Sequence, residues 1–114
     1  MLSIARRMAD RLGIDPELVF RVKSLGGASG QTLGGRIFLD PKAFRAGFDA
    51  RLGRMVSPLE NLKRTLIHER AHVLQSLKHP DAYWSGQAAI IDAFEKTAYR
   101  FEDFWYGAMR RAGR

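Results

Sequence analysis

The first half of the chain changes from a helical to an alternating pattern of hydrophobic and polar positions. In residues 2–12 apolar side chains recur every three or four positions, which predicts a short amphipathic helix. In residues 19–25 apolar and basic side chains alternate, which predicts a half-buried strand. Residues 31–33 and 36–39 flank Gly34-Gly35, a dipeptide typical of a hairpin turn. The pattern therefore predicts one helix followed by a small sheet.

The second half of the chain predicts two long helices. Residues 40–47 begin with Asp-Pro and predict a short helix, and residues 48–56 form a basic connection. Ser57-Pro58-Leu59-Glu60 is a capping box with proline at the first helical position, so a long helix begins there. It ends at His79-Pro80, because the residue before proline is biased away from helical geometry. The last helix is expected over residues 81–111.

These elements predict an α+β fold in which a small antiparallel sheet is followed by two long helices. The 114 residues are enough for a single domain, 1–114, with a modest core. The chain has no cysteine and therefore no disulfide framework. Arg6 and Arg7 stand where a signal peptide has its apolar run, and no stretch approaches transmembrane length. We therefore expect a soluble, cytoplasmic protein with no membrane partner.

The helix that begins at Pro58 contains the segment His68-Glu69-Arg70-Ala71-His72. Histidines four positions apart lie one turn apart on the same helix face, close enough to ligate one metal ion. Glu69 points to the side, from where it can act as a general base toward a water molecule. The opposite face is expected to form a core seam of Leu59, Leu62, Leu66, Val73 and Leu77. The helix therefore separates a core from a candidate metal site.

A catalytic zinc ion needs a third protein ligand, which here must be His, Asp or Glu because the chain has no cysteine. His79 would lie about 10 Å from His72 along the helix axis, too far to share an ion. Glu95 lies in the middle of an apolar, small-residue stripe, where a carboxylate is costly unless it is paired or binds a metal. Glu102 shares the stripe and Asp92 lies at its edge. The sequence therefore predicts Glu95 first and Glu102 next.

The segment His68-Glu69-Arg70-Ala71-His72, followed by a glutamate on the next helix, resembles the gluzincin branch of the zinc metallopeptidases. The short chain is similar to the minimal members called minigluzincins, whose third-ligand segment matches Glu95-x-x-Ala98. The extension H-E-x-x-H-x-x-Q through Gln75 is similar to small bacterial peptidase-like domains. Thermolysin-like gluzincins place an Asp four positions after the ligand Glu to orient a zinc histidine, and this chain has Tyr99 there. Glu102 or a backbone carbonyl is then expected to orient the histidine.

The resemblance implies a peptidase that hydrolyses peptide or protein substrates with the help of Zn²⁺. It implies His68, His72 and Glu95 as the zinc ligands. Glu69 would take a proton from the attacking water and later hand it to the leaving amine. In zincins an extended substrate adds to the edge strand of the sheet. One arm of the 31–39 hairpin is expected to form this edge here, and Arg36–Phe38 is the predicted segment.

A peptidase also needs a hydrogen-bond donor for the negative charge that develops on the carbonyl oxygen. Tyr99 follows Glu95 by one turn on the same face, so it is the predicted donor. Tyr83 and Tyr106 are the alternatives.

The positive charge of the chain favours a second class of function. Net charge is +7, and arginines gather at both ends of the chain. Such an excess suits a non-catalytic binding module for nucleic acid or an acidic protein, with a structural or vestigial metal site. No nucleic-acid recognition motif accompanies it. The aromatic residues of the last helix are predicted to anchor it to the core: Phe101, Phe104, Trp105 and Tyr106.

Overall fold

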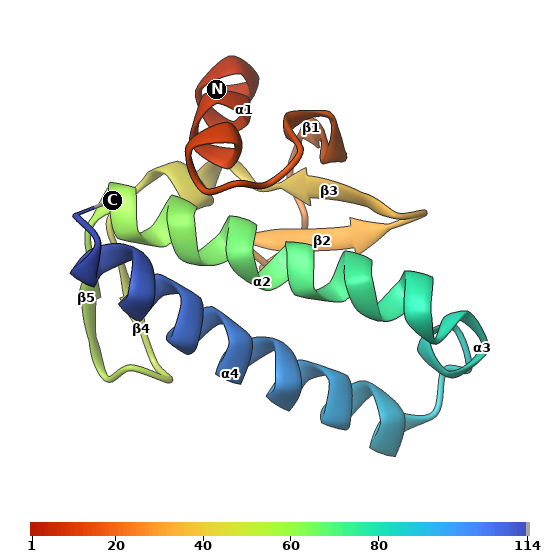
Figure 1. The fold of residues 1–114 in the computed structure, drawn as a ribbon. Helices are drawn as coiled ribbons and strands as arrows, with labels where there is room; N and C mark the ends of the chain where they lie inside the picture. Colours follow the sequence, from red (N-terminus) through yellow and green to blue (C-terminus); the bar gives the residue numbers. More distant parts are fainter. Residues whose placement is uncertain (114) are drawn as a thin grey trace.

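The structure is a computed structural model in which residues 1–113 are described. Its elements, in chain order, are α1 (Leu2–Arg11), the 3₁₀ turn η1 (Pro16–Leu18), β1 (Val19–Val22), β2 (Gly30–Leu33), β3 (Arg36–Leu39), the 3₁₀ turn η2 (Pro41–Phe44), β4 (Gly47–Asp49), β5 (Arg54–Val56), α2 (Pro58–Lys78), α3 (Pro80–Tyr83) and α4 (Ala88–Arg111). Helix α2 lies between the sheet and α4 (Figure 1). The predicted α+β fold is thereby confirmed.

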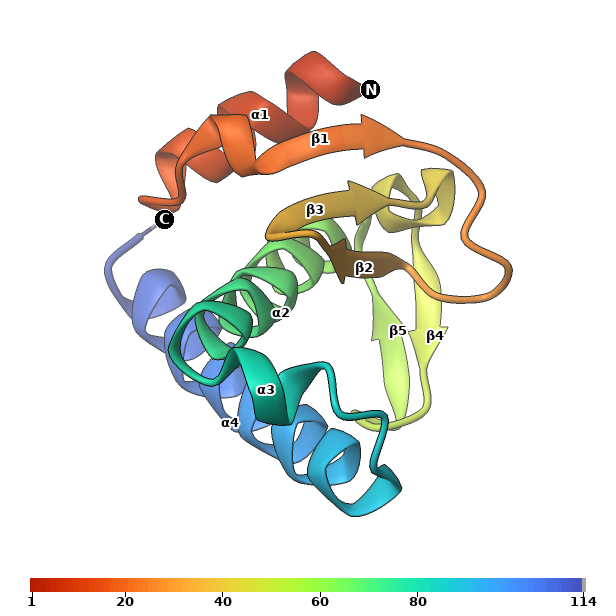
Figure 2. The same cartoon turned by 90° about the vertical axis from the view of Figure 1, so that its right-hand side faces the viewer.

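The main sheet has the strand order β1-β3-β2. Strands β2 and β3 form the predicted antiparallel hairpin, and Gly34 and Gly35 turn it with φ of 59° and 72°. Strand β1 pairs with β3 in parallel, so the sheet is mixed rather than antiparallel throughout. The loop of residues 23–29 makes this order possible, because it carries the chain from the end of β1 to the opposite edge of the sheet (Figure 2).

Residues 41–56 differ from the predicted short helix and connection. Only Pro41–Phe44 is helical, and the chain then forms a second antiparallel hairpin from β4 and β5. Phe48 and Met55 face each other across this hairpin and are 68% and 61% exposed. Alternating apolar positions reveal a strand only when one of its faces is buried, and these exposed side chains give no such signal.

The hydrophobic core lies between α1, the main sheet and α2. The largest fully buried side chains are Leu12, Ile14, Val19, Ile37, Leu39, Leu66 and Ile67. Leu59 and Leu77, predicted to belong to the core seam of α2, are 53% and 70% exposed. They lie in the first and last turns of a helix roughly 31 Å long, whereas four-residue strands span roughly 13 Å. The two ends of α2 therefore project past the sheet.

The predicted last helix is interrupted near its start. Helix α3 ends at Tyr83, and Gly86, with φ of 73°, lies in the turn that precedes α4. Three of the predicted aromatic anchors pack against the core: Phe101, Trp105 and Tyr106. Phe104 is 70% exposed, so its predicted place in the core is wrong. None of the helices in residues 1–113 has the length and apolarity that crossing a membrane requires.

Candidate metal centre

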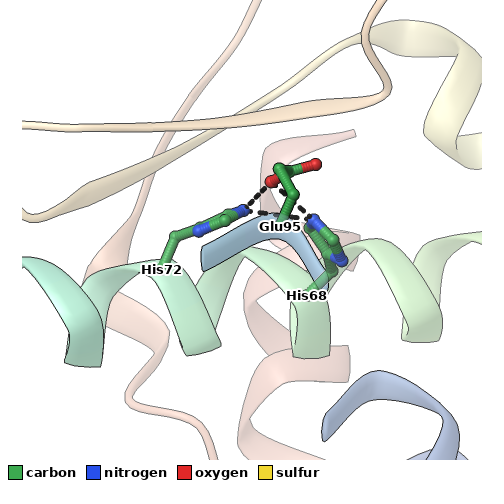
Figure 3. A group of neighbouring side chains, drawn as sticks. All are labelled: His68, His72 and Glu95. Carbon is green, nitrogen blue, oxygen red and sulfur yellow. Dashed lines mark hydrogen bonds and ion pairs between the residues drawn. The ribbon is translucent and has the colours of Figure 1, made fainter. Parts of the chain in front are cut away.

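Helix α2 presents the two histidines of the motif toward α4. The helix begins as predicted, with Ser57 Oγ accepting a hydrogen bond from the Glu60 amide at 3.0 Å and Pro58 in the first turn. His68 and His72 lie in the middle of α2, and each is 8% exposed. Both imidazoles point toward Glu95 of α4 (Figure 3).

The side chains of His68, His72 and Glu95 converge. The two Nε2 atoms are 3.2 Å apart, and His68 Nε2 lies 3.3 Å from Glu95 Oε1. His72 Nε2 also contacts Glu95 Oε1. One ligand atom from each residue lies within 4.8 Å of the others, so the three side chains can hold one metal ion. Neither Glu102 nor Asp92, the alternatives for the third ligand, belongs to this group.

Helix α4 packs against α2 and carries Glu95 to the histidines. Ala98, which follows Glu95 by about one turn, is completely buried. A larger side chain there would push the two helices apart. His79 is exposed and stacks on Phe94 with ring centroids 6.3 Å apart, so its predicted exclusion from the ligands agrees with its position.

Gln75 orients His72. Its Oε1 lies 2.8 Å from His72 Nδ1, and its Nε2 donates a hydrogen bond to the Phe94 carbonyl at 3.0 Å. With the Gln75 amide oriented in this way, His72 Nδ1 carries the proton and Nε2 keeps its lone pair for a metal. The sequence pattern predicts no role for Gln75, although its position three residues after His72 is compatible with a contact between the two side chains.

Glu102 orients His68 from the other side. Its Oε1 lies 3.2 Å from His68 Nδ1, while its Oε2 accepts hydrogen bonds from Arg51 at 2.8 Å and Arg64 at 3.1 Å. Glu102 is only 4% exposed. A carboxylate buried to this extent requires charged partners, which the two arginines supply. The structure therefore places Glu102 beside the candidate ligand His68, where the sequence allowed for an orienting residue.

The arginines beside Glu102 belong to a larger ion-pair network. Arg51, from the turn of the β4–β5 hairpin, also binds Asp103 at 2.8 Å. Arg64 binds Asp103 at 2.9 Å and Glu60 at 2.8 Å, and Glu60 in turn binds Arg54 at 2.7 Å. The network therefore connects the hairpin, α2 and α4 behind His68.

Glu69 lies beneath strand β2. It is 5% exposed, and Thr32 Oγ1 donates to its Oε1 at 2.9 Å. Gly30 lets the strand approach this closely, because a Cβ at this position would be 2.8 Å from both Glu69 Cγ and Thr65 Cγ2. The requirement for glycine depends on packing between elements distant in the sequence, so it cannot be predicted from the local pattern of residues.

Opposing effects set the protonation of the centre. Burial lowers the pKa of His68, but hydrogen bonds with Glu102 and Glu95 outweigh it and raise the pKa to about 9. The hydrogen bonds with His68 and His72 hold the pKa of Glu95 well below its usual range. Burial raises the pKa of Glu69, although the histidine charges act in the opposite direction. The charges of His68 and Glu95 therefore stabilise each other.

The three candidate tyrosines occupy different places. The Tyr99 ring lies 4.4 Å from the His68 ring, and Arg51 Cζ lies 4.4 Å from the Tyr99 ring centroid. Tyr83 approaches the centre from α3, with its ring 6.1 Å from that of His72, and burial raises its pKa to about 12. Both line the cleft beside the centre, whereas Tyr106 lies under Arg64 and does not.

A cleft of about 620 Å³ lies between β2, the three converging side chains and the α3–α4 segment. Residues 27–33 border it, so the edge strand beside the centre is β2. The expectation that Arg36–Phe38 forms this edge is wrong, because β3 lies between β1 and β2. Parallel pairing of β1 with β3 determined the strand order, and local sequence does not reveal that pairing.

Comparisons with protein-family models, with curated proteins and with solved structures found no match for this chain. Only the motif and the geometry around it therefore point to a function.

Proposed function

We propose that this protein is a zinc-dependent peptidase of the gluzincin type. The observation that carries the proposal is the convergence of His68, His72 and Glu95. Two imidazoles and one carboxylate are a ligand set of catalytic zinc sites. Each histidine is oriented through Nδ1, which directs Nε2 toward the shared position. The residues present therefore fit a zinc ion.

The proposed chemistry divides between the ion and Glu69. When bound, zinc supplies a Lewis acid that polarises a peptide carbonyl and makes a water molecule more acidic. Glu69 takes the proton from the attacking water and passes it to the leaving amine. Its buried position supports this role, because the raised pKa makes the carboxylate a stronger base. The hydrogen bond from Thr32 fixes the direction of the carboxylate.

Strand β2 provides a place for an extended substrate. The register with β3 and the hydrogen bond from the Asp40 amide to the Ser29 carbonyl show which backbone groups face β3. In an antiparallel pair these groups alternate, so the N–H and C=O of Gly30 and Thr32 point toward the open edge. A peptide strand that adds to this edge would run beside Glu69.

We propose that Tyr99 donates the hydrogen bond to the developing oxyanion, with Tyr83 as the alternative. Both rings border the cleft, one beside His68 and the other beside His72. A Tyr99→Phe variant is expected to lose about 10²-fold in kcat while it keeps its zinc. If Tyr83→Phe loses this activity and Tyr99→Phe does not, the donor is Tyr83.

The decisive experiment combines metal analysis with peptide hydrolysis. The purified protein is expected to contain about one zinc per chain, and Glu95→Ala is expected to lose it. Asp92→Ala is the matched control, because Asp92 is an exposed carboxylate on the same helix and pairs with the exposed Lys96 at 2.9 Å. Glu69→Gln should keep zinc and lose hydrolysis of a peptide library. Full hydrolysis by Glu69→Gln with zinc bound would refute the mechanism, and absence of zinc after reconstitution would refute the metal site.

A further inference from the structure

The outer face of the main sheet carries basic and aromatic side chains together. Ile37 and Leu39 of β3 are buried toward the helices, so Arg36 and Phe38 project from the opposite face. Strand β1 adds Phe20 and Arg21, and the chain continues into Lys23. We call these five residues the basic sheet face: Phe20, Arg21, Lys23, Arg36 and Phe38.

The cations of the basic sheet face lie against its aromatic rings. Phe20 and Phe38 meet edge to face with centroids 5.6 Å apart. Arg36 Cζ lies 4.5 Å and Arg21 Cζ 5.5 Å from the Phe20 centroid, and Lys23 Nζ lies 5.0 Å from that of Phe38. A guanidinium held over a ring is pre-oriented and still has N–H groups to donate.

Negative charge is missing from this part of the chain. Residues 18–39 contain no aspartate or glutamate. Within residues 1–113, none of the three cations of the basic sheet face forms an ion pair, in contrast to Arg51, Arg54 and Arg64. The carboxylate of the nearby Asp40 accepts backbone hydrogen bonds from Leu25 at 2.8 Å and Lys42 at 2.9 Å. The charge of the face is therefore available to an anionic partner.

We infer that the basic sheet face binds single-stranded nucleic acid. Three cations can contact backbone phosphates, and aromatic rings and guanidinium planes give unpaired bases surfaces for stacking. An acidic peptide would use the charges and leave the rings unused. A membrane surface would need apolar side chains to insert, whereas the exposed groups here are mainly cationic. Duplex grooves are entered by a helix or a two-stranded ribbon, whereas this face is formed by side chains of adjacent strands within a three-stranded sheet.

The test is fluorescence anisotropy of a labelled 12-nucleotide single strand with the full chain at increasing salt. The variant Arg21→Gln/Lys23→Gln/Arg36→Gln should weaken binding by about tenfold or more at low salt, and its log–log salt slope should be smaller by about 2. A control with the same charge change is Arg7→Gln/Lys78→Gln/Arg110→Gln, whose residues are exposed elsewhere. This control should keep most of the affinity. Circular dichroism melting establishes that both variants fold.

The aromatic contribution is measured separately with Phe20→Leu/Phe38→Leu. This variant should lose at least about fivefold in affinity and keep the salt slope, because stacking is lost and the charges remain. Equal losses in the two charge variants would overturn the inference, because binding would then follow net charge alone. Equal or tighter binding of polyglutamate, anionic vesicles or duplex would overturn the choice of ligand. Glu69→Gln should bind the strand normally, which separates this result from the proposed peptidase activity.

Discussion

The His68 half and the His72 half of the centre are supported in different ways. His68 is oriented by the buried carboxylate of Glu102, which two arginines neutralise. His72 is oriented by the neutral amide of Gln75, which also binds the backbone of α4. A carboxylate partner makes an imidazole more basic, but a buried charge depends on its own partners. The first half therefore depends on a network that includes the β4–β5 hairpin, and the second depends only on the contact between two helices.

The largest difference between the halves should appear in Glu102→Ala. The change leaves Arg64, whose side chain is 12% exposed, with less compensating negative charge. Unfolding free energy should fall by about 3 kcal/mol, as for other broken buried ion pairs. Zinc affinity should also fall by roughly 10- to 100-fold. Urea unfolding of the metal-free protein and a competitive chelator titration measure the two effects.

Glu102→Gln is the matched control for this prediction. Its amide oxygen can still accept a hydrogen bond from His68 Nδ1, whereas the negative charge facing the arginines is gone. It should keep most of the zinc affinity and lose much of the stability. If both variants lose zinc equally, the charge of Glu102, rather than its orienting hydrogen bond, is what zinc binding requires.

Gly30→Ala should have a smaller effect on stability. It touches neither the His68 half nor the His72 half directly, because it acts through Glu69. The new methyl would lie 2.8 Å from Glu69 Cγ, which overpacks the contact between β2 and α2. Unfolding free energy should fall by about 2 kcal/mol, and hydrolysis should fall more than zinc affinity. Gly47→Ala is the control, since a Cβ there meets nothing within 4 Å. Equal stability of the two variants would show that β2 does not lie this close to Glu69.

Gln75→Ala tests the His72 half, whose orienting partner is a neutral amide. It removes the hydrogen bonds to His72 and to the Phe94 carbonyl without leaving a buried charge. Unfolding free energy should fall by about 1 kcal/mol, and zinc affinity by about tenfold. We therefore expect a similar loss of zinc affinity in Gln75→Ala and Glu102→Ala, but a smaller loss of unfolding free energy in Gln75→Ala. Equal losses of stability would mean that the ion-pair network does not set the halves apart.

The smallest effect is a pH dependence of stability that comes from the ion-pair network of the His68 half. Hydrogen bonds with Arg54 first, and with Arg64, lower the pKa of Glu60 from 4.5 to about 2 against the opposing effect of burial. Because the folded-state pKa is the lower one, this stabilisation is complete above about pH 4.5 and is lost as pH falls toward 2. The contribution to unfolding free energy should be about 0.5 kcal/mol after screening by solvent. Unfolding free energy of Glu60→Gln should therefore fall less steeply than that of the wild type over this range.

Local signals predicted much of the centre. The capping box located the start of α2, and helical spacing placed His68 and His72 on one face. Glu95 joins them as predicted, but the stripe around it is only partly buried, since the Glu95 side chain is 41% exposed. Each of these signals lies within one helix. The sequence alone could not assign Gln75 or Gly30, because their roles depend on contacts with α4 and α2. The same limit explains the edge strand, since the order of the sheet depends on a parallel pairing between distant segments.

The two ends of helix α4 are held to the rest of the molecule by different numbers of buried side chains. The buried side chains of this helix are Ala98, Glu102 and Met109, all of which follow residue 97. Residues 88–97 contain no buried side chain, and Glu95 and the Phe94 carbonyl connect this segment to α2. Few buried contacts mean a low free energy of local opening. Backbone amides of residues 88–97 should therefore exchange with deuterium rapidly in the metal-free protein and slowly with zinc bound, so that capture of the ion and closure of the helix become one event.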